Sequence, residues 1–387
     1  MVSKRYVEKD FAIISHDSLH RIVIFGVLAV LMILTGCNRE KAPIKIGFAG
    51  GLTGRYSDLG TSGRNGVTLA VEEVNAEGGI HGHSVELMVR DDRQNPKTAV
   101  QADEDLIQKG VVAIIGHMTS DVAVAAVPVM DRTGVLMISP TVSTPVLSHK
   151  DDEFIRVIPE MSEQPRVQAE YAFTKIGLHR MAMIYDLANR AYSEEYVNIF
   201  KSSFEKLGGQ VTATITFTHG AGTHFDVLAH EAVASGCDGV LIAAGALDTA
   251  MICQQLRREN AELRIFSSGW AMTQDFIHSA GRAAEGVMFA HFYDLNSRQD
   301  AYAQFEKRFV ARFGAPPDFA AVAGYDAAHV LLAALSQNSD PRTLKATILQ
   351  QKQFHGVSGD FEINAFGDCK RHFFLFIVAD GRFKTLE

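Results

Sequence analysis

Two short hydroxyl-rich segments stand directly after apolar runs that have the pattern of buried strands. Gly116–Asp121 follows the run Val111–Ile115 and carries Ser120, and Ser139–Pro145 follows the run Val135–Ile138. In an open parallel sheet, ligands bind beyond the carboxyl ends of the strands, where helix N-termini present free backbone N–H groups. Two such segments on neighbouring strands predict a cradle for a carboxylate. The alternative for Ser120 is a local role as the N-cap of the next helix, which serine often has.

The signatures of catalysis and of cofactor binding are missing from the sequence. It contains no GxSxG elbow, HExxH pair or catalytic cysteine pattern, and the Gly-rich stretch 54–66 lacks the Lys-Ser/Thr of a phosphate-binding loop. Asp91-Asp92 stands at a strand end with no nucleophile and base beside it. His219, His224 and His230 match no familiar metal-ligand spacing. The sequence therefore favours binding without catalysis, with no cofactor and no metal.

The elements that must position these residues follow a repeated order. From Lys45 onward, short apolar runs alternate with stretches whose apolar residues recur at helical spacing. A second series of the same kind begins after residue 158, and its strands are expected at 181–185, 211–217, 240–244 and 263–266. Such alternation is typical of parallel sheets with helices on both faces. The predicted fold class is α/β, with two doubly wound, Rossmann-like lobes and a cleft between them.

These patterns divide the chain into four parts. The predicted parts are a signal peptide (1–36), a lipidated linker (37–43), lobe I (44–158 plus 293–351) and lobe II (159–292 plus 352–387). No low-complexity linker separates the lobes, so short structured crossovers are expected to join them.

Composition excludes several classes of protein. The chain has 387 residues, of which 47% are hydrophobic and 21% are charged, an ordinary globular balance. Its formal charge is −8 and it has no dense run of Lys and Arg, so nucleic acid is not an expected partner. Cys237, Cys253 and Cys369 are widely spaced without a CxxC pair, which indicates neither a zinc site nor a disulfide framework. One disulfide and three separate buried thiols are both compatible with the sequence.

The N-terminal region has the pattern of an export signal. The apolar run Ile22–Leu34, with Arg21 before it, is too short to cross a hydrocarbon core, which needs roughly 20 helical residues. Leu34–Cys37 forms a lipobox, so cleavage before Cys37 is expected to leave a lipidated cysteine. An unmodified thiol after a plain signal or signal anchor is the alternative. The polar stretch Met1–His20 is long for a signal, which is compatible with a start codon downstream of Met1.

The Gly-rich opening of the chain after this signal has a specific likeness. Ala49–Gly54, Leu59-Gly60 and Gly66–Gly82 resemble the opening of type I periplasmic binding proteins of the leucine/isoleucine/valine-binding family. The match continues in order through Asp91-Asp92, Asn95-Pro96, Gly116-His117, Ile138–Pro140 and Ala284–Gly286. The resemblance covers the chain from Lys45 to its C-terminus.

The resemblance implies a solute receptor of an ABC importer, whose two lobes close on a ligand. In this family, hydroxyls after the Gly-His and Ser-Pro segments hold the ligand's carboxylate, a tyrosine reaches it from the second lobe, and a residue of the first loop packs near it. The corresponding positions here are Leu59, Ser120, Thr141, Val142, Ser143 and Tyr192.

The sequence departs from the family where amino-acid binders hold the ammonium group. The segment Phe266–Trp270 contains no acid, and Ser268 takes the expected position. A hydroxyl cannot replace the charge-assisted bond of a carboxylate to an ammonium group. Ala246 stands where an aromatic is expected and would enlarge the pocket, while Trp270 either lines it or packs at a strand end. The missing acid and the small Ala246 both predict a ligand that is bulkier and less zwitterionic than leucine, unless Asp121 or Asp248 binds the ammonium group.

We therefore expect a lipid-anchored, extracytoplasmic receptor that binds a small carboxylate-bearing ligand and delivers it to an ABC permease in the cytoplasmic membrane. The ligand would be a branched-chain or other amino acid, or an aliphatic or aromatic acid. The alternatives are a ligand-sensing module for a membrane signalling or cell-envelope partner and, from another class, an enzyme.

Overall fold

The computed structural model describes residues 41–220, 222–292, 300–338 and 340–386. Residues 43–387 form one compact unit. The predicted signal peptide at 1–36 and the predicted lipidation site Cys37 lie outside the described residues, so both stay predictions.

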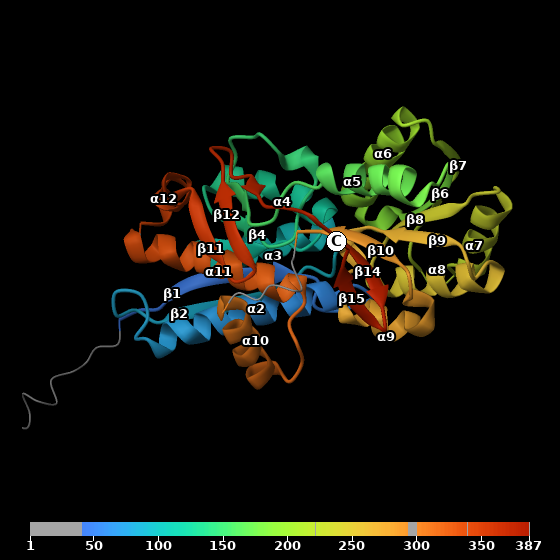
Figure 1. Ribbon diagram of the computed structural model, residues 1–387. Coiled ribbons are helices and arrows are strands. Elements are labelled where there is room, and N and C mark those ends of the chain that lie inside the picture. Colours follow the sequence, from blue (N-terminus) through green and yellow to red (C-terminus); the bar gives the residue numbers. More distant parts are fainter. Residues whose placement is uncertain (1–40, 221, 293–299, 339, 387) are drawn as a thin grey trace, which may run out of the picture. The chain divides into compact units, whose positions relative to one another are not determined.

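The first lobe is built on a parallel sheet with the strand order β2-β1-β3-β4-β5 (Figure 1). Its strands are β1 (Ile44–Gly50), β2 (Val85–Asp91), β3 (Ala113–Gly116), β4 (Leu136–Ser139) and β5 (Phe154–Arg156). Every residue of β3, β4 and β5 is buried, which is expected where helices cover both faces of a parallel sheet. The hydroxyl-rich segments after β3 and β4 consequently emerge side by side at one edge of the sheet.

The helices of this lobe come from two distant parts of the chain. They are α2 (Ser57–Ala76), α3 (Pro96–Gln108), α4 (Ser120–Thr133), α10 (Asp300–Phe313), α11 (Phe319–Gln337) and α12 (Leu344–Gln351). Helix α11 packs closely along α2, because a Cβ added to Gly66 would lie 2.0 Å from the carbonyl oxygen of Ala321. Helix α11 is apolar and long enough to span a membrane, but 83% of its apolar window is buried inside the protein. It is therefore a core helix of this lobe.

The second lobe contains a larger sheet with the order β15-β14-β10-β9-β8-β6-β7. Its strands are β6 (Arg180–Asp186), β7 (Gln210–Phe217), β8 (Gly239–Ala243), β9 (Arg264–Ser267), β10 (Met288–His291), β14 (Phe374–Ala379) and β15 (Arg382–Thr385). Its helices are α5 (Glu163–Tyr171), α6 (Arg190–Lys206), α7 (Phe225–Ala234), α8 (Ala246–Glu259) and α9 (Gln274–Ala280). Strands β6 to β10 are parallel, and β14 and β15 add an antiparallel edge. The predicted α/β class with two doubly wound lobes is confirmed.

A small antiparallel sheet differs from the predicted division of the lobes, which gave all of 352–387 to lobe II. The sheet consists of β11 (Gln353–Gly356), β12 (Gly359–Ile363) and β13 (Cys369–Lys370). The backbone N–H of Arg156 donates to the carbonyl of Gly367 at 3.0 Å, and Arg371 pairs with Asp326 of α11 at 2.6 Å. These buried long-range contacts, which sequence periodicity does not reveal, hold the segment against the first lobe. We propose that lobe II resumes only at β14.

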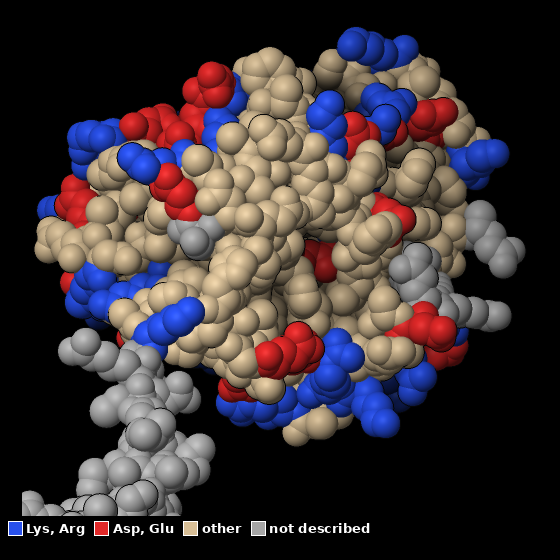
Figure 2. All heavy atoms as spheres, turned by 90° about the vertical axis from the view of Figure 1, so that its left-hand side faces the viewer, with Lys and Arg blue, Asp and Glu red and all other residues tan. Residues whose placement is uncertain are grey.

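Neither the surface nor the cysteines change the class of protein inferred from composition. On the face shown in Figure 2, acidic and basic side chains both occur around the rim, and uncharged residues cover the middle. Cys237, Cys253 and Cys369 are free thiols, so the structure contains no disulfide among its described cysteines.

Candidate functional site

A narrow cavity lies where the carboxyl ends of the two parallel sheets face each other. Its volume is about 30 Å³, so the two lobes stand close together. The residues lining it come from both lobes and are Leu59, Met118, Ser120, Thr141, Ser143, Ile158, Gln164, Asn189, Tyr192, Gly269, Trp270, His291, Phe292 and Phe319. The cavity lies where open α/β sheets bind ligands.

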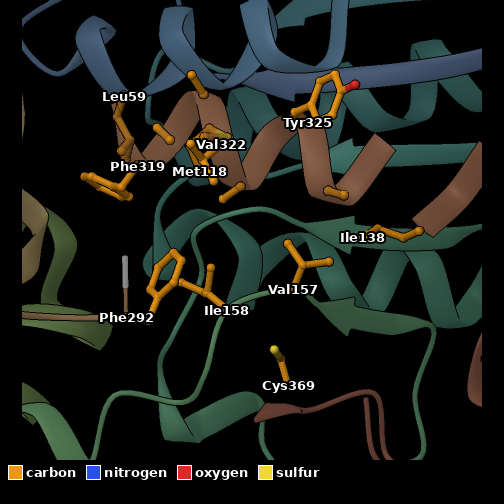
Figure 3. Close-up of a cluster of buried hydrophobic side chains, with 14 of the residues drawn as sticks. Leu59, Met118, Ile138, Val157, Ile158, Phe292, Phe319, Val322, Tyr325 and Cys369 are labelled. Carbon is orange, nitrogen blue, oxygen red and sulfur yellow. The ribbon is translucent and has the colours of Figure 1, made fainter. Parts of the chain in front are cut away.

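Apolar side chains form one part of the cavity wall. Figure 3 shows Leu59, Met118 and Phe319 of the first lobe on one side, with Ile158 and Phe292 facing them. All five are buried. Burial of hydrocarbon or of an aromatic ring of a ligand against this wall would therefore be favourable.

Three polar side chains in the wall lack a protein partner. Ser120, Ser143 and Gln164 are at most 4% exposed, and their side chains form no hydrogen bond with any residue that the structure describes. Thr141 differs, because its hydroxyl donates to the carbonyl of Met118 at 2.6 Å. Because these three side chains face the cavity, their polar groups are available to hydrogen-bond a polar ligand there.

Ser120 does not cap its own helix. Thr119 is the N-cap of α4, in an extended conformation, and its own side chain makes no capping hydrogen bond. The second backbone N–H of the helix, that of Asp121, donates to the side chain of Asn189 in the second lobe at 3.1 Å. The capping alternative for Ser120 is therefore excluded, and the positive end of the α4 dipole lies beside the cavity.

The cavity wall is uncharged at neutral pH. Burial lowers the pKa of His291 to about 3, which keeps the imidazole neutral. Burial raises the pKa of Tyr192 to about 12, so the phenol also stays neutral. The other lining residues are not titratable. A ligand in this cavity would consequently meet dipoles and not charges.

The structure brings six of the nine predicted ligand-binding positions to the cavity. These are Leu59, Ser120, Thr141, Ser143, Tyr192 and Trp270. Val142 is buried in the core of the first lobe, whereas its neighbours Thr141 and Ser143 line the cavity. Ser268 is fully buried beside Tyr192, outside the lining set. The binding roles of these positions stay predictions.

Ala246 does not enlarge the cavity as its small side chain led us to expect. It packs in the core of lobe II, at the start of α8. The aromatic ring near this position comes instead from the other lobe, because Tyr56 lies so close to Gly245 that an added Cβ would be 2.5 Å from the ring. The centroids of Tyr56 and Trp270 are 5.1 Å apart. The Tyr56 ring therefore packs beside the start of α8, next to Trp270.

The two acids that could replace the missing ammonium partner are engaged elsewhere. The Asp121 carboxylate accepts the backbone N–H groups of Arg190 and Ala191, at 2.9 and 2.7 Å. Asp248 pairs with Arg55, with 2.7 Å between Oδ1 and Nη2. Both sets of contacts join the lobes, and neither acid lines the cavity.

Other lining residues did not emerge from the sequence. They are Met118, Ile158, Gln164, Asn189, Gly269, His291, Phe292 and Phe319. Asn189 lies just after β6, and His291 is the last residue of β10. The strand-end rule, applied to the second lobe, would therefore have found both. Gln164 lies in the first turn of α5 and Phe319 begins α11, and no local pattern identifies such positions.

A buried charge cluster holds the loop that carries Ser120. The Nδ1 atom of His117 lies 2.7 Å from Asp92, after β2, and its Nε2 atom lies 3.1 Å from Asp103 of α3. All three side chains are almost completely buried. Burial lowers the pKa of His117, but the carboxylates of Asp103 and Asp92 outweigh it and raise the pKa to about 10. The resulting imidazolium ties the segment after β3 to two neighbouring elements.

Two α/β lobes with an uncharged cavity between them are typical of a two-lobed solute-binding protein. A match to the family described as periplasmic binding protein covers residues 43–380. The chain belongs to the periplasmic binding protein family.

Individual relatives support this membership. The Leu/Ile/Val-binding protein BraC3 of Rhizobium johnstonii is 26% identical over 337 residues, covering 84% of this chain and 90% of the relative. The crystal structure of a leucine binding protein, LivK, from Thermotoga maritima has a TM-score of 0.82 at 26% identity, covering 89% of this chain and 98% of that one. A solute binding protein of an ABC transporter from R. palustris, in complex with benzoate, shares the fold, with a TM-score of 0.81 at 23% identity, covering 89% and 95%.

The resemblance to the leucine/isoleucine/valine-binding branch is thereby confirmed. The protein is a solute-binding protein and not an enzyme, and its family places it outside the cytoplasm.

The His117 cluster predicts how stability depends on pH. The folded state keeps the His117 proton up to about pH 10, whereas an unfolded histidine loses it near its ordinary pKa of about 6.5. The stabilising contribution is therefore complete below about pH 6.5 and is lost as pH rises towards 10. Urea unfolding at several pH values should show the free energy of unfolding declining over this range.

Two variants separate His117 from other titrating groups. The exposed His230→Gln should retain the whole decline, and His117→Gln should show a smaller one. Equal declines in wild type and His117→Gln would contradict the assignment of the charge to this cluster.

Proposed function

We propose that this protein is the extracytoplasmic solute-binding lipoprotein of an ABC importer and that it binds a small carboxylate between its closing lobes. The observation that carries the proposal is the set of polar groups of Ser120, Ser143 and Gln164 that line an otherwise largely apolar cavity without a hydrogen-bond partner among the described residues. Two hydroxyls and the N-terminus of α4 supply donors for a carboxylate. The apolar wall would cover the rest of the ligand.

The absence of charge in the wall favours an acid that has no ammonium group. No lining residue carries a negative charge, and Asp121 and Asp248 are occupied by contacts between the lobes. An ammonium group buried here without a carboxylate partner would be strongly destabilised. The R. palustris protein of the same fold is in complex with benzoate, a carboxylate of this type.

The lipid on Cys37 would keep the receptor at the membrane that contains its permease. A tethered receptor meets its partner at high effective concentration, so it does not need to bind the permease tightly.

A ligand screen tests the class of ligand. Because a bound ligand stabilises the folded protein by RT ln(1 + [L]/Kd), thermal-shift measurements rank ligands at equal concentration. Benzoate and branched aliphatic acids without an α-amino group should raise the Tm at least as much as leucine or isoleucine does. A response confined to α-amino acids would show that the ammonium group has a partner and that the proposed ligand class is wrong.

Ser120→Ala tests the carboxylate cradle. Loss of one hydrogen bond to a charged group typically costs about 1.5 to 3 kcal/mol, which corresponds to roughly a ten- to hundredfold increase in Kd. We expect that increase for the best acid of the screen, measured by calorimetry, with an unchanged Tm of the ligand-free protein. Ser202→Ala, at an exposed position of α6, is the matched control and should leave Kd unchanged. An unchanged Kd in Ser120→Ala would remove Ser120 from the site.

Cys37→Ser tests the anchor. Without the thiol no thioether to diacylglycerol can form, so the protein expressed in its native host should move from the membrane to the soluble extracytoplasmic fraction. Cys237→Ser should stay with the membrane, because its thiol lies within the second lobe. A Cys37→Ser protein that remains membrane-bound, or a wild-type protein without lipid in its intact mass, would contradict lipidation.

A further inference from the structure

A short segment of the first lobe reaches into a socket in the second. Arg55 and Tyr56, which directly precede α2, meet Asp186 at the end of β6 and Asp248 in the first turn of α8. Both acids are fully buried. The Tyr56 ring lies over Gly245, where a Cβ would collide with it, and a bond from Gln94 to the Tyr56 carbonyl, 2.8 Å long, holds the segment to its own lobe.

The hydrogen-bond donors in this socket are fewer than its acceptors require. Tyr56 Oη lies 2.9 Å from Oδ2 of Asp248 and also contacts Oδ2 of Asp186. A phenol has one hydrogen and can donate to only one of these two oxygens. The other contact is a hydrogen bond only if that carboxyl carries a proton which it donates to the phenol oxygen.

The surroundings indicate which acid holds the proton. Asp248 Oδ1 pairs with the guanidinium of Arg55 at 2.7 Å, which favours the carboxylate form of Asp248. Asp186 has no cationic partner among the described residues, and its Oδ1 accepts a backbone N–H from Ala188 at 2.9 Å. Burial raises the pKa of Asp186, and Asp248 adds to this against hydrogen bonds from Tyr56, Ala188 and the backbone of His219.

We infer that Tyr56 is a positioning residue for the closed state and that closing of the lobes takes up one proton from solvent at Asp186. In the closed state the Asp186 carboxyl donates to Tyr56, and Tyr56 donates to the Asp248 carboxylate. When the lobes open, Tyr56 leaves, Asp186 meets water and the proton returns to solvent. The inference rests on the proposed ligand-driven closure and adds a pH dependence to it.

Tyr56 connects this socket to the cavity through Trp270. The centroids of the Tyr56 and Trp270 rings are 5.1 Å apart, and those of Trp270 and Tyr192 are 5.9 Å apart. Trp270 and Tyr192 both line the cavity. A ligand that packs against Trp270 therefore also stabilises the position of Tyr56 in the socket, and loss of the Tyr56 contacts should weaken ligand binding.

The sign of the pH effect follows from linkage. The closed state binds one more proton than the open state at any pH between the ordinary pKa of an exposed Asp, about 3.9, and the raised pKa of Asp186 in the socket. Ligand affinity should consequently fall as pH rises through this window, by at most tenfold per pH unit. The groups facing the socket are Arg55, Asp248 and His219, whose Nδ1 lies 3.4 Å from Asp248 Oδ1.

The sole tryptophan of the chain provides the measurement, because Trp270 lies between the socket and the cavity. Its fluorescence should report benzoate binding from about pH 5 to about pH 8. The Kd of wild type should increase with pH. The amide of Asp186→Asn can donate to Tyr56 as a protonated carboxyl would. The Kd of this variant should therefore stay nearly constant with pH, at the value that wild type has at the lowest pH. Tyr56→Phe should weaken binding and reduce the pH dependence.

Two control variants address other titrating groups between and near the lobes. Burial raises the pKa of Asp58 to about 6, and its carboxylate accepts a hydrogen bond from Thr273 of the second lobe. His219 faces the socket. Asp58→Asn and His219→Gln should both keep the part of the pH dependence that Asp186→Asn removes. A pH dependence equal in wild type and Asp186→Asn would overturn the inference, as would unchanged binding and pH dependence in Tyr56→Phe.

The proposed ligand class and the proposed proton uptake at Asp186 can be tested separately. If benzoate binds to neither protein at any pH, the proposed ligand class is wrong, and the same comparison is made with the compound that gives the largest thermal shift in the screen. Its Kd should still increase with pH in wild type and stay nearly constant in Asp186→Asn, because Tyr56 docks beside Trp270 in the closed state. Equal pH dependences of Kd in the two proteins would overturn the proton uptake itself.

Discussion

The contact between the two lobes is the constraint on which the whole site depends. Neither lobe forms the cavity alone, since residues from both line it, and Tyr56, Asp121 and Asn189 make hydrogen bonds across from one lobe to the other. These hydrogen bonds join polar groups that water can solvate in an open form. Polar contacts of this kind hold two surfaces in register without the large apolar burial that would make closure permanent. A binding protein needs this balance, because the ligand must supply the difference between open and closed.

Unlike the contacts between the lobes, the contacts within the first lobe hold its part of the cavity wall rigidly. His117 ties the loop after β3 to Asp92 and Asp103, so Ser120 is presented from a backbone that is fixed within the first lobe. Helix α11 closes on α2 through glycines and brings Phe319 to the same wall. Hydrogen-bond donors that are already oriented lose little entropy when a ligand arrives. The arrangement separates fixed recognition within a lobe from movement between lobes.

The sequence predicted the fold and much of the first-lobe site because both depend on local order. Alternating strands and helices determine where parallel strands end, and strand ends locate Ser120, Thr141 and Ser143. The roles of Tyr56 and Ala246 depend on a distant part of the chain, since the ring that fills the space near Ala246 belongs to the other lobe. The placement of β11 to β13 likewise follows from ion pairs such as Arg371–Asp326, which no periodicity encodes.

An uncharged cavity has a physical advantage for a receptor that must release its ligand. A carboxylate held by a buried arginine or lysine would gain a strong charge-assisted bond, and opening would have to break it. In the proposed complex, hydroxyls, an amide and a helix N-terminus would stabilise the same charge through several weaker dipoles, each of which water can replace as the lobes separate. Keeping His291 neutral by burial serves the same end, because an imidazolium there would attract the carboxylate too strongly. Charge is placed instead at the contacts between lobes, where it acts on closure and not directly on the ligand.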